Sequence, residues 1–410
     1  MVEAVIDFIL RYKAIILFYL AILIFVYLHK TKIDFQAKII MLYRTSFGIK
    51  AKKWAYKRYG ERIKLVGYVA AGVGFIGMIF ITYTLIQNLI KLLIEPAAQS
   101  GVALILPGVN IPGLGVLPFW HWLISIFVIA LIHEFGHGIV AKAHGVKIHN
   151  TGFVLIGPII GAFVEPDEKQ MAKQSDIVNY SILGAGPFAN VLLAGLAILL
   201  LSFVFNPIHA GMLEETGFTF ETYAGELMPT EIAGIPLKTT INSINGETTT
   251  TFQDFASVLQ CEGPGDTITV TGFATSEDNT ELGETQDYNI TLTNNPDDVS
   301  RPFLGISTIS NDFQIKEAYQ TGLKRAWYEV INWLVEFSRW TFILSLGIGL
   351  FNLLPLPIVD GGKMAQIFLR KLKGKVKGDH IYSKISVLLL FILLFSLLLP
   401  LIKKLFGFIF

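Results

Sequence analysis

Long apolar stretches dominate this 410-residue sequence. A helix needs about 20 mostly apolar residues to cross the hydrocarbon core of a bilayer. Six stretches approach or exceed that length, and they lie near residues 5–28, 65–94, 119–143, 177–205, 329–354 and 385–402. Charged residues make up 16% of the chain, whereas soluble domains contain about 25%. The sequence therefore predicts a polytopic α-helical membrane protein with about six transmembrane helices.

The charges between these stretches predict which loops face the cytoplasm. Residues 30–64 contain eleven Lys or Arg against two acidic residues, and residues 363–384 contain seven against one. Residues 211–312 contain two Lys or Arg against 17 acidic residues, a net charge of −15. Because basic loops tend to stay in the cytoplasm, we expect 211–312 and the N-terminus outside. Lys403 and Lys404 fit this orientation less well. We assign the basic segment 30–64 to anionic lipid headgroups rather than to nucleic acid.

An H-E-x-x-H motif, His133-Glu134-Phe135-Gly136-His137, interrupts the apolar stretch 119–143. Residues four apart share a helix face, so His133 and His137 could bind one Zn²⁺ while Glu134 activates a water molecule. Each ionisable group deep in an apolar span costs roughly 2.5–3.5 kcal/mol, and a bound cation would offset that cost. The alternative is a pair of hydrogen-bonded helix histidines beside a glutamate. The motif favours a metal hydrolase with Glu134 as the catalytic base.

A catalytic zinc usually has three protein ligands, so a third is needed here. Cys261 is the only cysteine, which leaves His, Asp or Glu. Asp360 follows the fifth apolar stretch, where two prolines break the helix and two glycines permit a turn that could aim the carboxylate inward. A helix N-cap role is the alternative for Asp360, and Glu165 is the rival ligand. Three further histidines, which we assign to membrane interfaces, are His121, His144 and His149.

Two short segments and two asparagines are also candidates for the site. Residues 152–166 are too short to span and rich in Gly and Pro, so we expect non-helical backbone that lines the site. An exposed strand edge there could hold a substrate extended. Residues 103–119 predict an outer hairpin or a loop that dips into the membrane interface. Asn190, in the fourth stretch, either forms a hydrogen bond between helices or contacts the substrate. The same two roles are open for Asn352.

The acidic insertion has the pattern of a small β-rich recognition module. Asn245-Gly246 predicts a turn. The expected strands are Thr240–Ile244, Thr267–Thr271 and Tyr288–Leu292, and the expected helix is Phe252–Leu259.

Three motifs, on three apolar stretches in order, resemble the site-2 protease family of intramembrane metalloproteases. They are His133-Glu134-x-x-His137, Gly186-Pro187-x-x-Asn190 and Asn352-x-x-Pro355-x-Pro357-x-x-Asp360-Gly361. The resemblance covers most of residues 65–380. It implies Zn²⁺ held by His133, His137 and Asp360, with Glu134 as general base and Asn190 and Asn352 in contact with substrate backbone or the oxyanion. The insertion is similar to a PDZ domain at Ile241-x-x-Ile244-Asn245-Gly246 and Pro264-Gly265-Asp266.

We therefore expect a zinc-dependent intramembrane endopeptidase that hydrolyses peptide bonds within or near transmembrane segments and takes part in regulated intramembrane proteolysis. Its partners are transmembrane protein substrates and the lipid bilayer, with no nucleic acid, and the PDZ-like domain filters substrate access. We expect a multi-pass cell-membrane protein whose N-terminus and PDZ-like domain are extracytoplasmic and whose active site lies toward the cytoplasm. The alternatives are a membrane-anchored recognition protein with a structural metal site, and an ion or metal transporter. The expected divisions are 1–64 (anchor helix and basic loop), 65–208 and 313–380 (protease core), 209–312 (PDZ-like domain) and 381–410 (C-terminal transmembrane helix).

Overall fold

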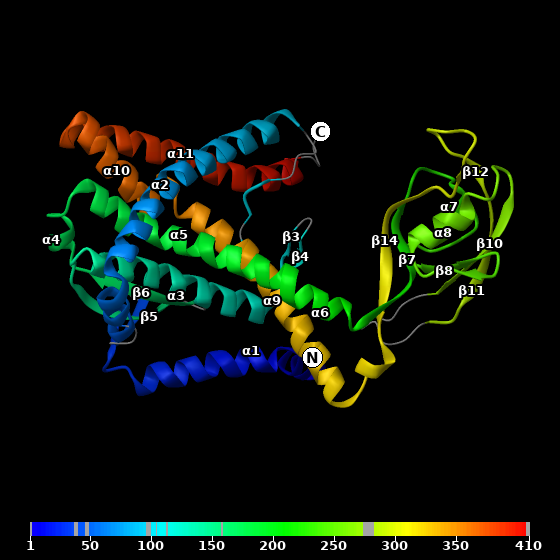
Figure 1. Ribbon diagram of the computed structural model, residues 1–410, viewed down its shortest axis with the longest axis horizontal. Coiled ribbons are helices and arrows are strands. Elements are labelled where there is room, and N and C mark those ends of the chain that lie inside the picture. Colours follow the sequence, from blue (N-terminus) through cyan, green and yellow to red (C-terminus); the bar gives the residue numbers. More distant parts are fainter. Residues whose placement is uncertain are drawn as a thin grey trace. The chain divides into compact units, whose positions relative to one another are not determined.

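The structure, a computed structural model, describes residues 2–36, 40–45, 49–95, 100–103, 105–111, 114–156, 159–273 and 283–406. Its chain contacts define two compact units (Figure 1). Unit 1 comprises Met1–Leu200 and Glu336–Phe410, and unit 2 comprises Leu201–Val335. Unit 2 thus includes all of the insertion predicted at 209–312, together with helical residues before and after it.

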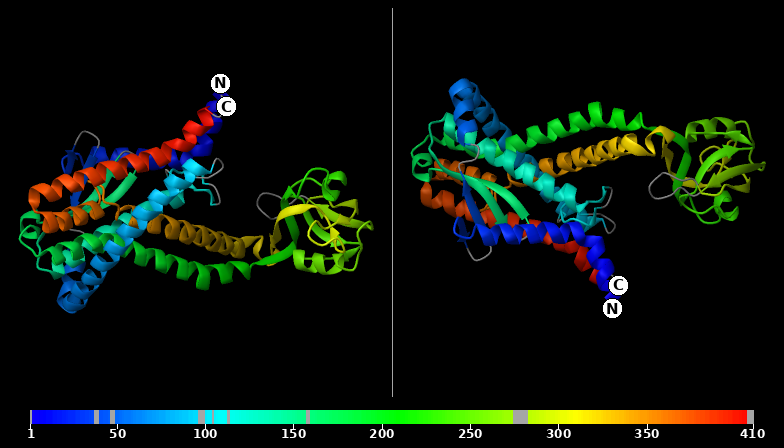
Figure 2. Two further views of the ribbon diagram at one scale, coloured as in Figure 1. Left: turned by 90° about the horizontal axis from the view of Figure 1, so that it is seen from above. Right: turned by 90° about the horizontal axis from the view of Figure 1, so that it is seen from below.

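Unit 1 is helical apart from its β-hairpins. Helices α2, α3 and α5 pack against one another, and α10 packs against α5 and α11 (Figures 1 and 2). The helices with residues in this unit are α1 (Val2–Leu28), α2 (Ile49–Ile94), α3 (Phe119–Ala143), α4 (Glu168–Met171), α5 (Asp176–Leu200), α9 (Gly322–Phe351, from Glu336 on), α10 (Asp360–Lys373) and α11 (Lys375–Phe406).

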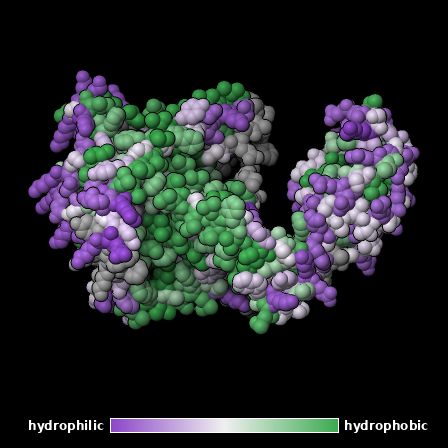
Figure 3. Space-filling view, viewed as in Figure 1, coloured by the Kyte–Doolittle hydropathy of each residue, from purple (hydrophilic) through white to green (hydrophobic). Residues whose placement is uncertain are grey.

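Five helices in the described part of the chain are long and apolar enough to cross a membrane. They are Lys57–Ile94, Phe119–Ala143, Asp176–Gly211, Gly322–Phe351 and Lys375–Pro400. On the face shown in Figure 3, hydrophobic residues cover much of unit 1, whereas hydrophilic residues dominate the surface of unit 2. This is a polytopic membrane protein. The first predicted span corresponds to α1, whose apolar part Lys13–Leu28 is shorter, so the count of six remains a prediction.

A four-stranded antiparallel sheet lies beside α3. Its order is β1-β2-β5-β6, so β6 forms one edge, and β6 packs along α3 (Figure 2). The strands are β1 (Ile33–Gln36), β2 (Ile40–Thr45), β5 (Ile148–Ile156) and β6 (Ile159–Pro166). The non-helical segment predicted at 152–166 is therefore most of the β5–β6 hairpin. The β1–β2 hairpin extends the sheet on the side of β5 opposite β6. The prediction of a basic loop at 30–64 did not include this hairpin.

The segment predicted as a hairpin or loop at 103–119 contains a second, much smaller sheet. Strands β3 (Asn110–Ile111) and β4 (Gly115–Val116) pair with each other there.

Unit 2 is built on a six-stranded sheet. Its strands run in the order β11-β10-β8-β7-β14, and β9 pairs with β8. The bounds are β7 (Leu213–Tyr223), β8 (Thr240–Ile244), β9 (Glu247–Thr248), β10 (Thr267–Phe273), β11 (Gln286–Thr291) and β14 (Ile306–Ile315). A two-stranded pair, β12 (Thr293–Asn294) and β13 (Pro302–Phe303), accompanies it. The helical segments are η1 (Leu201–Phe205), α6 (Asn206–Ala210), α7 (Pro229–Ile232), α8 (Phe252–Leu259), η2 (Glu317–Tyr319) and the first part of α9.

The elements expected in the insertion appear at their predicted places. β8 and α8 have the predicted bounds, and Asn245 and Gly246 both have positive φ, 50° and 81°, as a tight turn between paired strands requires. α8 begins with a capping box formed by Thr251 and Asp254. Phe218 and Phe255 are fully buried in the core. The long strands β7 and β14 were not predicted; β14 forms one edge of the sheet and β7 lies next to it.

Candidate metal centre

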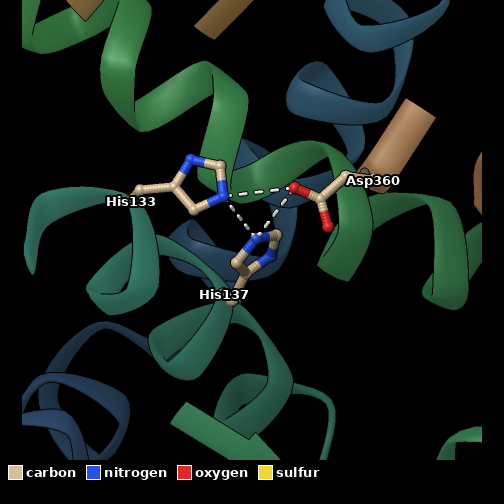
Figure 4. A group of neighbouring side chains, drawn as sticks. All are labelled: His133, His137 and Asp360. Atoms are coloured by element: carbon tan, nitrogen blue, oxygen red, sulfur yellow. Dashed lines mark hydrogen bonds and ion pairs between the residues drawn. The ribbon is translucent and has the colours of Figure 1, made fainter. Parts of the chain in front are cut away.

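Helix α3 carries both histidines of the H-E-x-x-H motif on one buried face. His133 and His137 are 9% and 8% exposed, and their Nε2 atoms lie 3.0 Å apart. Their rings point toward one another and toward Asp360 (Figure 4). The four-residue spacing of a helix face thus brings two imidazole nitrogens to one point.

Asp360 reaches the same point from α10, 223 residues further along the chain than His137. Its Oδ2 lies 3.1 Å from His133 Nε2 and 3.2 Å from His137 Nε2. Asp360 is the first residue of α10, and its side chain faces the imidazoles instead of capping the helix. The Gly361 amide donates to the Asn352 carbonyl at 2.8 Å, which fixes the turn before α10.

The two glycines after Asp360 act by allowing close packing rather than by an unusual backbone conformation. Neither has a positive φ. A Cβ on Gly361 would collide with the Leu353 carbonyl, and a Cβ on Gly362 would collide with the Leu356 carbonyl. Larger residues would therefore push Asp360 away from the histidines.

The donor set and its spacing fit a zinc ion. Two imidazole nitrogens and a carboxylate oxygen form the ligand set of many catalytic zinc sites, and bonds of about 2.0–2.1 Å in a tetrahedron place neighbouring ligands about 3.3 Å apart. The three distances here, 3.0, 3.1 and 3.2 Å, are close to that value. These three residues form the cluster in the described chain that could hold a metal.

Helix α5 closes one side of this cluster. Gly186 lies so close that a Cβ there would collide with His137 Nε2 and would come within 2.6 Å of His133 Nε2. Pro187 and Asn190 follow on the same helix. Position 186 must therefore be glycine if both imidazoles are to keep these positions.

The outer nitrogen of each imidazole has its own partner on α5. His137 Nδ1 lies 2.7 Å from the Ile182 carbonyl, and His133 Nδ1 lies 3.1 Å from Asn190 Nδ2. Partners of this kind orient metal-binding histidines. No side-chain pattern could have revealed Ile182, because its contribution is a backbone carbonyl.

Glu134 is adjacent to the histidines and points to the sheet. Its Oε2 accepts a hydrogen bond from the Val164 amide of β6 at 2.9 Å. The edge strand thus holds the carboxylate that the motif predicts to be the base. Sequence reasoning missed Val164 because its contribution is also a backbone group.

The side chains of the other candidates make contacts outside the cluster of His133, His137 and Asp360. Asn352, the residue after α9, donates from its Nδ2 to the Ile348 carbonyl in the last turn of that helix at 3.1 Å. Glu165 accepts from Asn150 Nδ2 at 2.8 Å and pairs with Arg44 at 3.4 Å, so the rival ligand belongs to the sheet. His149 pairs with Asp167 at 3.2 Å, and His144 caps the end of α3. His121 is buried near the start of α3, about three helical turns before His133.

Comparisons with known proteins found relatives of two kinds. The chain is 29% identical over 194 residues to the uncharacterized protein MJ0971 of Methanocaldococcus jannaschii, an alignment that covers 45% of this chain and 50% of that protein. The chain thus spans about half the length of that relative. A solved PDZ domain of an SdrC-like protein from Listeria monocytogenes is similar at 17% identity, with a TM-score of 0.18, covering 22% of this chain and 86% of that one.

The family model described as Peptidase family M50 matches residues 121–395, a range that begins in α3 and ends in α11. The match includes the H-E-x-x-H helix, the α5 residues behind it and the turn that carries Asp360. It covers well over half of the chain. The chain belongs to peptidase family M50, the site-2 protease family of membrane metalloproteases.

Proposed function

We propose that this chain is a zinc-dependent endopeptidase that hydrolyses a peptide bond within, or at the cytoplasmic edge of, a transmembrane segment of another protein. The observation that carries the proposal is the meeting of His133, His137 and Asp360 from two separate helices. Glu134 follows His133 directly in the sequence. Membership of peptidase family M50 supports the reaction class.

His133, His137 and Asp360 are the residues that would hold the ion. When bound, Zn²⁺ polarises the scissile carbonyl and makes water acidic enough to lose a proton near neutral pH. Glu134 takes the proton of the attacking water and delivers it to the leaving amide nitrogen, so it serves first as base and then as acid. The hydrogen bond from the Val164 amide to Oε2 fixes the Glu134 carboxylate at β6 during these transfers.

The edge of β6 is the proposed binding site for the substrate backbone. The Val164 amide faces Glu134 instead of β5. Amides two residues apart on a strand face the same side, so the Ala162 amide faces the same edge. An extended substrate that pairs with this edge would lie beside Glu134, and its peptide bonds would be exposed for hydrolysis.

We also propose that residues 209–312 form a PDZ-like domain outside the cell that admits substrates already trimmed on that side, as regulated intramembrane proteolysis requires. The acidic charge of this segment, −15, and the basic segments of unit 1 support the orientation. Deletion of residues 211–312 should widen the range of substrates cut. Unchanged substrate choice would exclude the filter.

The central experiment uses the purified, zinc-loaded full chain in detergent with single-span model substrates. Cleavage should stop with a chelator, and Glu134→Gln should reduce it by about 10²–10⁴-fold with the zinc content unchanged. Zinc content without cleavage in the wild type would indicate a structural site. Metal flux into vesicles without cleavage would indicate a transporter.

A further inference from the structure

One buried polar atom of Asn190 has no hydrogen-bond partner in the part of the chain that the structure describes. The residue is 0% exposed, and its Nδ2 lies 3.1 Å from His133 Nδ1. No donor among the described residues reaches its Oδ1. A buried amide oxygen normally accepts a hydrogen bond, so this arrangement needs an explanation.

The neighbouring histidine shows which hydrogen pattern the metal centre requires. The Ile182 carbonyl can only accept, so His137 carries its hydrogen on Nδ1, and its Nε2 keeps a free lone pair. His133 presents Nε2 to the same point, 3.0 Å from His137 Nε2. To bind the same ion, His133 must also carry its hydrogen on Nδ1, and that hydrogen needs an acceptor.

Asn190 is the group positioned to be that acceptor. The two ends of a carboxamide have nearly the same size, so packing does not decide which end faces His133, and hydrogen bonding does. With Oδ1 toward His133, the amide oxygen gains its donor and Nε2 is left free for a metal. With Nδ2 toward His133, Nδ1 is the acceptor, and the hydrogen moves to Nε2, where it faces Asp360.

We infer that Asn190 is a positioning residue whose Oδ1 accepts the Nδ1 hydrogen of His133, so that Nε2 is the metal-binding nitrogen. Its place in the fold suits this role. The Asn190 amide lies on the Nδ1 side of the ring, away from the metal-facing Nε2. The residue is also held from behind, because Ser345 Oγ donates to the Asn190 backbone carbonyl at 2.8 Å.

This role differs from that of a substrate ligand or an oxyanion donor. Those functions require an N–H that points at the substrate, whereas this one requires an oxygen that points at His133. An aspartate keeps the oxygen and loses the N–H, and an alanine loses both. The pair Asn190→Asp and Asn190→Ala therefore separates the two roles.

The test measures the zinc affinity of the full chain in detergent, without substrate, by competition with a chromogenic chelator. The inference rests on the proposed zinc site. Asn190→Ala should weaken zinc binding by about 10–100-fold, as is typical when such a partner is lost. Asn190→Asp should bind zinc about as tightly as the wild type, because a carboxylate accepts the same hydrogen.

Either of two results would overturn the inference: wild-type zinc affinity in Asn190→Ala, or an equal loss of affinity in both variants. Should Asn190→Ala fail to fold, ¹⁵N-histidine NMR of the zinc-loaded wild type decides instead, with His133 assigned by its absence in His133→Ala. A hydrogen on His133 Nδ1 is expected, and its absence would refute the role. A wild type that binds zinc and cuts no substrate would refute the proposed function and leave this inference intact.

Discussion

Gly186 of α5 faces His137 of α3 so closely that a Cβ at position 186 would collide with the His137 Nε2 atom. The two helices can therefore meet at the metal centre only with glycine at this position. The contact involves the atom that would bind the metal, so its disturbance should affect chemistry before it affects the fold.

Gly186→Ala should abolish zinc binding and proteolysis. The added methyl group must displace at least one imidazole, and a shift of about 1 Å can cost 10²-fold in rate. Metal content and cleavage of a single-span substrate measure the effect. The matched control is Gly195→Ala on the same helix, where a Cβ meets nothing within 4 Å. Equal losses in both variants would show that the effect is on α5 as a whole.

Removal of zinc should lower the thermal stability of the wild type. A ligand present at 100 times its Kd stabilises the folded state by about 2.7 kcal/mol, and here it joins α3 to α10 through His137 and Asp360. A thermal-unfolding scan with and without chelator measures the shift. Asp360→Ala should greatly reduce it, whereas Glu134→Gln should keep it. A shift that persists undiminished in Asp360→Ala would place the ion elsewhere.

Ala162→Pro should raise KM for transmembrane substrates. Proline removes the backbone N–H at the edge of β6 without removing a bond to β5, because this amide faces the same side as that of Val164. Steady-state cleavage of a single-span substrate gives KM, and zinc content should stay at the wild-type value. Ala162→Ser, which keeps the amide, is the control. If the proline variant had an unchanged KM, pairing at β6 would be excluded.

The capping box of α8 should make this helix sensitive to acid. Hydrogen bonds from Thr251 and Thr250 lower the pKa of Asp254 below its ordinary value. A lowered pKa in the folded state stabilises the helix above the unfolded pKa of about 3.9, and this stabilisation is lost as the pH falls through the folded value. Asp254→Asn should therefore lose hydrogen-exchange protection in α8 at pH 7, and the difference from wild type should shrink toward pH 3. A difference independent of pH would contradict this.

The sequence indicated the side chains that meet at the metal centre because each breaks a strong local pattern. His133 and His137 interrupt an apolar helix at four-residue spacing, and Asp360 follows a proline break at the end of an apolar stretch. Backbone partners could not be foreseen in the same way. Nearly every residue has a backbone carbonyl and an amide N–H, so the sequence does not mark those of Ile182 and Val164. Only the fold brings these two groups to the site.

Two other features depended on contacts between distant parts of the chain. The basic segment 30–64 was not predicted to contain β1 and β2. The pairing of β2 with β5 joins residues more than 100 apart, so no local pattern indicates it. Lys403, which fits the predicted orientation less well, also contacts a distant residue. Its Nζ donates to the Leu92 carbonyl at 2.6 Å, at the last turn of α2, where a helix leaves carbonyls without partners.

The β1–β2 hairpin also decides how many places an incoming peptide could join the β5–β6 hairpin. β5 has a neighbour on both sides, β2 and β6, whereas β6 has one on a single side. If residues 33–45 were removed, the outer side of β5 would become available as well, and a peptide would divide between two rival positions. Only one of these passes Glu134, so under the proposed mode of substrate binding the N-terminal strands would prevent unproductive docking.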